Sequence, residues 1–153
     1  PHLCGKYPDL RNLSVCMRLC DRDDLVVLMS DGVHDNFDPQ HFGQSPQAHG
    51  LPFATWDDAA ARAFARTQSA KAAYQQHEML RVIHAARPTP ASPVEPETLV
   101  RALVDHVVRV TAPSRTWMCE NPKKKLPHDY VRFPGKLDHT SCLCIKVGAF
   151  SAP

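Results

Sequence analysis

Residues 25–29 form an uninterrupted apolar run, Leu-Val-Val-Leu-Met, which constrains the fold more than any other feature of this chain. A run of that length and composition predicts a buried β-strand, which we expect to continue to Ser30. The strand leads directly into Asp31 and Gly32. A carboxylate at the end of a buried strand is held in place by the strand and exposed by the turn, so it can bind a cation. Gly32 lets the backbone bend sharply or approach a ligand closely.

A second acidic turn precedes another apolar run late in the chain. Residues 135–141 read Gly-Lys-Leu-Asp-His-Thr-Ser, and residues 142–147 read Cys-Leu-Cys-Ile-Lys-Val. The second of these segments predicts another strand. If the two predicted strands run antiparallel side by side, the end of the first lies beside the start of the second. Asp31 and Asp138 would then converge at one edge of the sheet.

Together the two motifs resemble those of the metal-dependent serine/threonine protein phosphatases of type 2C, the PPM-type family. That family has a hydrophobic strand ending in Ser/Thr-Asp-Gly-x-x-Asp, and later a Gly-x-x-Asp-(Asp or Asn)-x-Ser/Thr turn before its closing strand. Residues 30–35 and 135–141 of this chain are similar to these patterns, in the same order and beside the same strands. The resemblance covers about residues 10–38 and about residues 95–148.

The resemblance implies an α+β fold that forms the C-terminal part of an α-β-β-α sandwich, in which antiparallel sheets are flanked by helices. It implies hydrolysis of phosphoserine and phosphothreonine in proteins by a metal-bound water, so no side chain is assigned as nucleophile. Asp31 and Asp138 match two metal ligands of the family. Asp35 matches an accessory ligand, and Gly32 is a candidate through its backbone. The cofactor would be two or more Mg²⁺ or Mn²⁺ ions, which prefer oxygen ligands and acidify bound water.

Two histidines stand beside these acidic residues where the family usually carries other residue types. His34 replaces an aromatic residue, and His139 replaces an Asp or Asn. As neutral rings they could orient a carboxylate or a bound water, and as cations they could hold phosphate or donate a proton. The alternative for both is packing within a turn.

The acidic segments and the phosphate-binding arginine that the family carries in its N-terminal half have no counterpart here. We therefore expect residues 1–153 to be the C-terminal portion of a single phosphatase-type domain, with the N-terminal half of that domain as its partner and a phosphoprotein as its substrate. The metal ions would be shared with residues outside this chain, and the chain alone would lack activity. The alternative is a non-catalytic, phosphatase-like binding or scaffold module.

The region between the motifs predicts mostly helix. Residues 57–86 lack Pro and Gly and are rich in good helix formers, which favours one long helix or two joined near Ser69. Relative to the family pattern, about residues 50–90 look like an inserted helical segment, which could bind a protein partner or only elaborate the surface. Residues 97–111 predict a second helix, whose apolar face packs on the sheet. Residues 112–136 predict a long connection.

An alternating stretch precedes the first predicted strand. Leu13, Val15, Met17 and Leu19 fall on one side of an extended chain, with polar residues and cysteines on the other. We expect residues 13–20 to form a strand that pairs with the next one as a β-hairpin, through a polar turn at residues 21–24.

The composition gives no support for a nucleic-acid or a membrane partner. A net charge of +2 and a pI near 8.4 are mild, and no stretch approaches the ~20 apolar residues that span a bilayer. The six cysteines are expected to be reduced and packed as small hydrophobes, which suggests a cytoplasmic or nuclear setting. Zinc binding by the Cys-x3-Cys and Cys-x-Cys pairs is the alternative, although neither has the spacing of a zinc finger.

Overall fold

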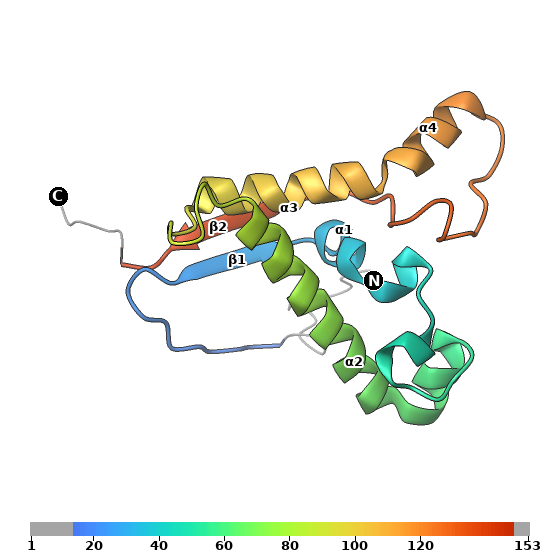
Figure 1. Cartoon of the computed structure of the whole chain (residues 1–153), viewed down its shortest axis with the longest axis horizontal. Helices are drawn as coiled ribbons and strands as arrows, with labels where there is room; N and C mark the ends of the chain where they lie inside the picture. The colour runs from blue at the N-terminus through green and yellow to red at the C-terminus, as the bar shows by residue number, and fades with distance from the viewer. Residues whose placement is uncertain (1–13, 149–153) are drawn as a thin grey trace, which may run out of the picture.

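The two apolar runs pair with each other. Strand β1 (Leu25–Met29) and strand β2 (Cys142–Lys146) are antiparallel, with Val27 opposite Cys144. The computed structural model describes residues 14–148, and within them these strands form the one sheet. Figure 1 shows the two strands side by side, β1 in blue and β2 in red, although they come from opposite ends of the sequence. Both predicted strands are confirmed, and the condition for the acidic turns to converge, antiparallel pairing, is met.

Helices and short 3-10 turns make up the rest of the regular structure. They are α1 (Asp31–His34), η1 (Asp35–Phe37), η2 (Pro39–Phe42), η3 (Pro46–His49), α2 (Trp56–Ala85), α3 (Pro96–Val110) and α4 (Ala112–Glu120). The described residues are therefore α+β, as expected, with one small antiparallel sheet. Among them, no helix combines the length and the apolar character needed to cross a membrane.

Helix α3 covers the inner face of the sheet, because its apolar residues recur every three or four positions. Leu103, which is 1% exposed, lies at the centre of this contact with Leu99 and Val107. Val33 and Phe37, from the short helical turns that follow β1, complete the same core and are fully buried. In Figure 1, α3 runs beside the strands, while α2 extends away from them toward η2 and η3. The acidic motif after β1 is thus held in place by the packing of Val33 and Phe37 in this core.

His106 is part of this core, as its place on the apolar face of α3 predicts. Its ring stacks on Phe37 with a centroid separation of 4.3 Å, and its Nε2 donates a hydrogen bond to the Asn36 carbonyl at 3.1 Å. Burial lowers the pKa of His106 below its ordinary value, although the hydrogen bond to Asn36 opposes the shift. The ring is therefore neutral in the folded protein at neutral pH.

The buried neutral His106 predicts a loss of stability in mild acid. Below pH 6.5, the ordinary pKa of histidine, the unfolded chain binds a proton that the folded protein does not accept until a lower pH. Unfolding then takes up a proton, so the free energy of unfolding falls as the pH drops from 7 toward 5. Urea titrations across this range should show a shallower pH dependence for His106→Gln than for the unsubstituted protein, and equal slopes would contradict this account.

The predicted strand at residues 13–20 is wrong for the part that the structure describes. Residues 14–20 have no regular structure, and Val15, Met17 and Leu19 are 85%, 90% and 98% exposed. Alternation stabilises a strand only when a surface covers its apolar side, and no described element covers this one. Leu13 lies outside the described residues. The turn at 21–24 is present, but β1 pairs with β2 and not with the segment before it.

Helix α2 is bent at a place that the sequence did not indicate. Thr55 caps its start, accepting a hydrogen bond from the Asp58 N–H at 3.1 Å. The helical path is interrupted at Ala63, where φ is −148° and ψ is 52°. The predicted junction near Ser69 is therefore wrong, while the single long helical segment is confirmed.

The connection predicted for residues 112–136 contains the additional helix α4. Pro113 lies in its first turn, where a helix does not need the missing N–H. Trp117 of α4 and Phe133 of the segment that follows meet edge to face with centroids 6.0 Å apart, which fixes the returning loop. This loop delivers the second acidic motif to the start of β2.

Candidate functional site

The hydroxyl of Ser30 joins the two acidic motifs. The Ser30 N–H donates to the Ser141 carbonyl at 2.9 Å, and its Oγ accepts from the Ser141 N–H at 3.0 Å. The same Oγ donates to the His139 carbonyl at 2.9 Å. These bonds extend the pairing of β1 and β2 beyond the sheet, so residues 109 positions apart in sequence are fixed together.

Gly32 allows the closest approach between the motifs. A Cβ atom added to Gly32 would overlap the backbone carbonyl of His139. The Gly32 N–H donates to Asp31 Oδ1 at 2.9 Å, and its carbonyl accepts from the Asn36 amide at 2.8 Å. The backbone of Gly32, a candidate cation ligand from the sequence, is thus occupied with local hydrogen bonds in this structure.

Asn36 connects the motifs from below and is fully buried. Its Nδ2 donates to the carbonyls of Gly32 at 2.8 Å and Lys136 at 2.9 Å, while its Oδ1 accepts from the Lys136 N–H at 3.0 Å. The Asn36 amide therefore bonds to the Lys136 backbone through both its nitrogen and its oxygen. Two such bonds restrict the position of that backbone in different directions. Lys136 is therefore held in place by its main chain.

Three carboxylates converge on the ammonium group of Lys136. Its Nζ lies 2.7 Å from Asp35 Oδ2, 3.3 Å from Asp138 Oδ2 and 3.5 Å from Asp31 Oδ2. We call these four residues the carboxylate cluster. The expected convergence of Asp31 and Asp138 is confirmed, and Asp35 joins them. With one cation and three anions, the cluster keeps two negative charges in excess.

The contacts within the cluster favour the charged forms of Asp35, Asp138 and Lys136. Partial burial raises the pKa of Asp35, but the hydrogen bond and charge of Lys136 outweigh it and leave that pKa below its usual value. The His139 N–H, which donates to Asp138 Oδ1 at 2.8 Å, and then Lys136 lower the pKa of Asp138. The hydrogen bond to Asp35, with support from the other carboxylates, raises the pKa of Lys136. Lys136 therefore stays protonated at neutral pH.

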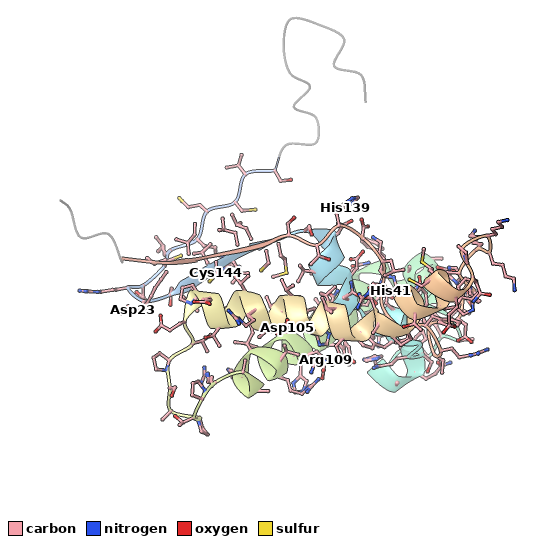
Figure 2. The ribbon with its side chains drawn as sticks, turned by 90° about the horizontal axis from the view of Figure 1, so that it is seen from above. Asp23, His41, Asp105, Arg109, His139 and Cys144 are labelled. Carbon is pink, nitrogen blue, oxygen red and sulfur yellow. The ribbon has the colours of Figure 1, made fainter. Side chains whose placement is uncertain are left out.

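The two histidines beside the acidic residues are placed differently. His34 Nδ1 lies 3.5 Å from Asp35 Oδ1 and 3.4 Å from Gln75 Nε2, so its ring borders the carboxylate cluster. The His139 side chain is fully exposed, with Nδ1 3.7 Å from Asp138 Oδ1. Figure 2 shows His139 at the end of the sheet near α1, far from Asp23 at the other end. His34 is thus the better placed of the two to contact a bound group.

The donor chemistry of the carboxylate cluster fits a hard divalent cation, since such ions take carboxylate oxygens. Within residues 14–148, however, no three His, Cys, Asp or Glu side chains are arranged as they stand to hold a metal ion. The Lys136 ammonium takes the central position, and the carboxylates are spread around it. The cluster therefore has oxygen ligands that suit a divalent cation, but the Lys136 ammonium lies among them.

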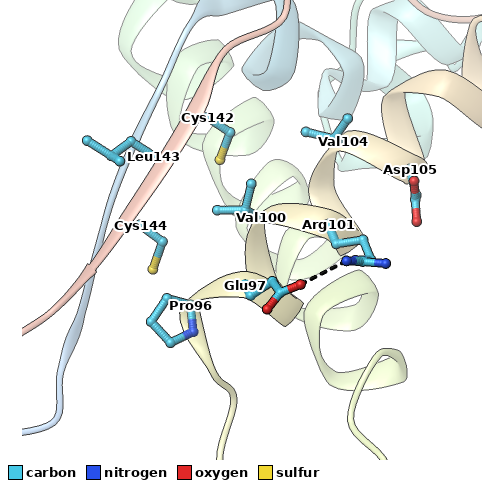
Figure 3. A pocket seen from close by; sticks show the side chains of 9 residues that line it. All are labelled: Pro96, Glu97, Val100, Arg101, Val104, Asp105, Cys142, Leu143 and Cys144. Carbon is cyan, nitrogen blue, oxygen red and sulfur yellow. Dashed lines mark hydrogen bonds and ion pairs between the residues drawn. The ribbon is translucent and has the colours of Figure 1, made fainter.

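The cysteines are only partly packed as the sequence suggested. Cys142 and Cys144 face α3 along the edge of β2, where they line a groove with residues such as Val100 (Figure 3). Burial raises the pKa of both thiols, so they remain protonated. Three other free cysteines are exposed, contrary to expectation: Cys16, Cys20 and Cys119. Cys4 lies outside the described residues.

Comparisons of this chain with models of protein families, with curated proteins and with solved structures found no match. The two motifs and the geometry of the carboxylate cluster are therefore the features of this chain that bear on its function.

Neither Asn36 nor Lys136 was assigned a role from the sequence. Both lie within or next to the acidic motifs, but their partners are 100 residues away in sequence. A lysine two positions before Asp138, inside a motif expected to bind a cation, is the one signal that could have drawn attention to the cluster.

Proposed function

We propose that this chain forms part of the divalent-cation site of a metal-dependent serine/threonine protein phosphatase. Asp31 and Asp138 are the cation ligands, and Asp35 assists them. The observation that carries this proposal is the meeting of carboxylates from both motifs around one positive charge. The order of the motifs and their attachment to paired antiparallel strands also support it.

In this proposal, a bound Mg²⁺ or Mn²⁺ supplies Lewis acidity and activates water toward a phosphoester. The chain's own residues hold the geometry. Ser30 and Asn36 fix the two acidic segments to each other, so the backbones that carry Asp31 and Asp138 are held close together. His34, at the edge of the cluster, is in place to orient Asp35.

The outer face of the sheet supports the proposal that this chain belongs to a larger sandwich. Leu28, Leu143 and Ile145 are 59%, 54% and 43% exposed and lie on the side away from α3. An apolar sheet face of this kind is normally covered by a second layer. The proposed cover is a sheet from the N-terminal half of the same domain, which would bring further cation ligands.

Substitution of the ligands tests the cation site. Asp31→Asn and Asp138→Asn are each expected to weaken Mn²⁺ binding about tenfold or more, because each removes an anionic oxygen ligand. Electron paramagnetic resonance of free Mn²⁺ measures the binding, and circular dichroism checks the fold. The matched control is Asp58→Asn, a carboxylate on α2 that pairs with Arg62. Equal Mn²⁺ binding in all variants would remove the ligand roles.

Activity gives a second arm of the test. A phosphoserine peptide with Mn²⁺ should be hydrolysed by a protein that combines this chain with its N-terminal half, and Asp31→Asn should abolish that turnover without unfolding the protein. Hydrolysis by residues 1–153 alone would contradict the proposal that the site is shared.

A non-catalytic binding or scaffold module is the second candidate, and the position of Lys136 favours it. An ammonium group among the carboxylates neutralises part of their charge without any metal ion. This candidate predicts that neither the unsubstituted protein nor any Lys136 variant binds Mn²⁺.

A further inference from the structure

We propose that the Lys136 ammonium is a built-in competitor for the divalent cation, so that an ion binds the carboxylate cluster only when Lys136 leaves it. This inference rests on the proposed cation site and adds a residue that controls access to it. The geometry carries it, because Nζ lies within 3.5 Å of oxygens from all three carboxylates. A metal ion that used the same three oxygens would need the space that Nζ occupies.

The main chain of Lys136 is fixed by hydrogen bonds, while its side chain is partly exposed to solvent. Asn36 holds its N–H and its carbonyl, at 3.0 Å and 2.9 Å. The preceding Gly135 has a φ of 81°, and a Cβ added there would overlap the Asn36 side-chain oxygen. The Lys136 side chain is 36% exposed, so its ammonium can swing into solvent without disturbing the backbone. The competitor is thus tethered beside the site at high local concentration.

Electrostatics makes the exchange feasible. The three carboxylates exceed the single ammonium by two negative charges, so a divalent ion compensates the cluster better than Lys136 does. The carboxylates are partly exposed, and solvent weakens each ion pair with Lys136. Lys136 therefore lowers the apparent affinity for the cation without abolishing it.

Removing the ammonium tests the competition directly. Lys136→Met keeps an unbranched apolar stem but loses the charge, and it is expected to tighten Mn²⁺ binding about tenfold or more, since binding no longer requires displacement of a cation. Lys136→Arg, which keeps a cation, should bind Mn²⁺ no more tightly than the unsubstituted protein. The matched control is Lys146→Met. Lys146 is 28% exposed and pairs with Asp23 and Glu95 at the opposite end of β2, so the same charge change there should leave Mn²⁺ affinity within about twofold.

The outcomes separate this inference from the proposed function. If the unsubstituted protein and Lys136→Met bind Mn²⁺ equally, the competition is overturned and the cation site stands. If Lys146→Met tightens binding as much as Lys136→Met, the effect is one of overall charge and the competition is again overturned. If no variant binds Mn²⁺ when this chain is combined with its N-terminal half, the cation site itself is refuted, and this inference falls with it.

A measurement on the unsubstituted protein covers the case in which a variant fails to fold. Amine-reactive labelling followed by mass spectrometry reports how freely each lysine reacts with reagent. Saturating Mn²⁺, at a concentration set by the binding measurement, is expected to raise labelling of Lys136 severalfold and to leave Lys146 unchanged. Unchanged labelling of Lys136 when the site is filled would show that its ammonium does not leave, and would overturn the inference.

Discussion

Gly32→Ala is expected to lower the free energy of unfolding by about 3 kcal/mol, because the added methyl group would overlap the backbone carbonyl of His139. That carbonyl cannot move aside easily, since it also accepts the hydrogen bond from Ser30 Oγ. The clash must separate the two acidic motifs or distort α1. Urea denaturation gives the free energy, and Mn²⁺ binding should weaken in parallel.

Gly50→Ala is the control for Gly32→Ala, and the two losses of stability are compared. Gly50 has a φ of 72°, but a methyl group added there would meet no atom of the described residues within 4 Å, so its substitution should cost only about 1 kcal/mol of backbone strain. Gly32 lies in a helical turn, where alanine is normally favoured over glycine by about 1 kcal/mol. Backbone preference alone would make Gly50→Ala the more destabilising of the two substitutions, which is the opposite order. A smaller loss of stability for Gly32→Ala than for Gly50→Ala would therefore contradict the contact with His139.

Asn36→Ala is expected to cost about 3 kcal/mol, because it removes three hydrogen bonds and leaves the carbonyls of Gly32 and Lys136 without that donor. Asn36→Asp keeps the shape of the side chain but places an oxygen against both carbonyls, so it should be at least as damaging. Chemical denaturation of both variants separates the loss of packing from the loss of hydrogen bonding.

Asn121→Ala is the control for Asn36. Asn121 also donates from Nδ2 to a carbonyl, that of Trp117 at 3.0 Å, but this bond is local to the end of α4. Its loss should cost about 1 kcal/mol. Similar losses for both asparagines would show that Asn36 does not join the acidic motifs in the way described.

The sequence identified the elements that have a strong local signal. The apolar runs at 25–29 and 142–146 predicted two strands, and the Ala-rich segment without Pro or Gly predicted α2. Helix α4 was missed because the prolines around it suggested a loop, although Pro113 is acceptable in a first turn. Periodicity also assigned a strand to residues 14–20, but a period of two does not reveal which segment will cover or pair with it.

The sequence predicted the acidic residues of the candidate site but not Asn36 and Lys136, which also shape it. The motifs named Asp31, Asp35 and Asp138, and the pairing of the strands brought them together. The role of Lys136 could not be read from its neighbours in sequence, since it depends on Asn36 and on two carboxylates from the other motif. Such a role exists only after tertiary contacts form, which is why local patterns did not contain it.

The pairing of β1 with β2 also sets the order in which the molecule can assemble. β1 leaves the ribosome long before its partner, and contacts such as that between Ser30 and His139 span 109 residues. Pairing across that distance requires closure of a long loop, which slows folding and leaves the apolar β1 strand exposed during synthesis. A nascent chain of this protein should therefore need protection by chaperones until β2 emerges, and its carboxylates cannot meet before that moment.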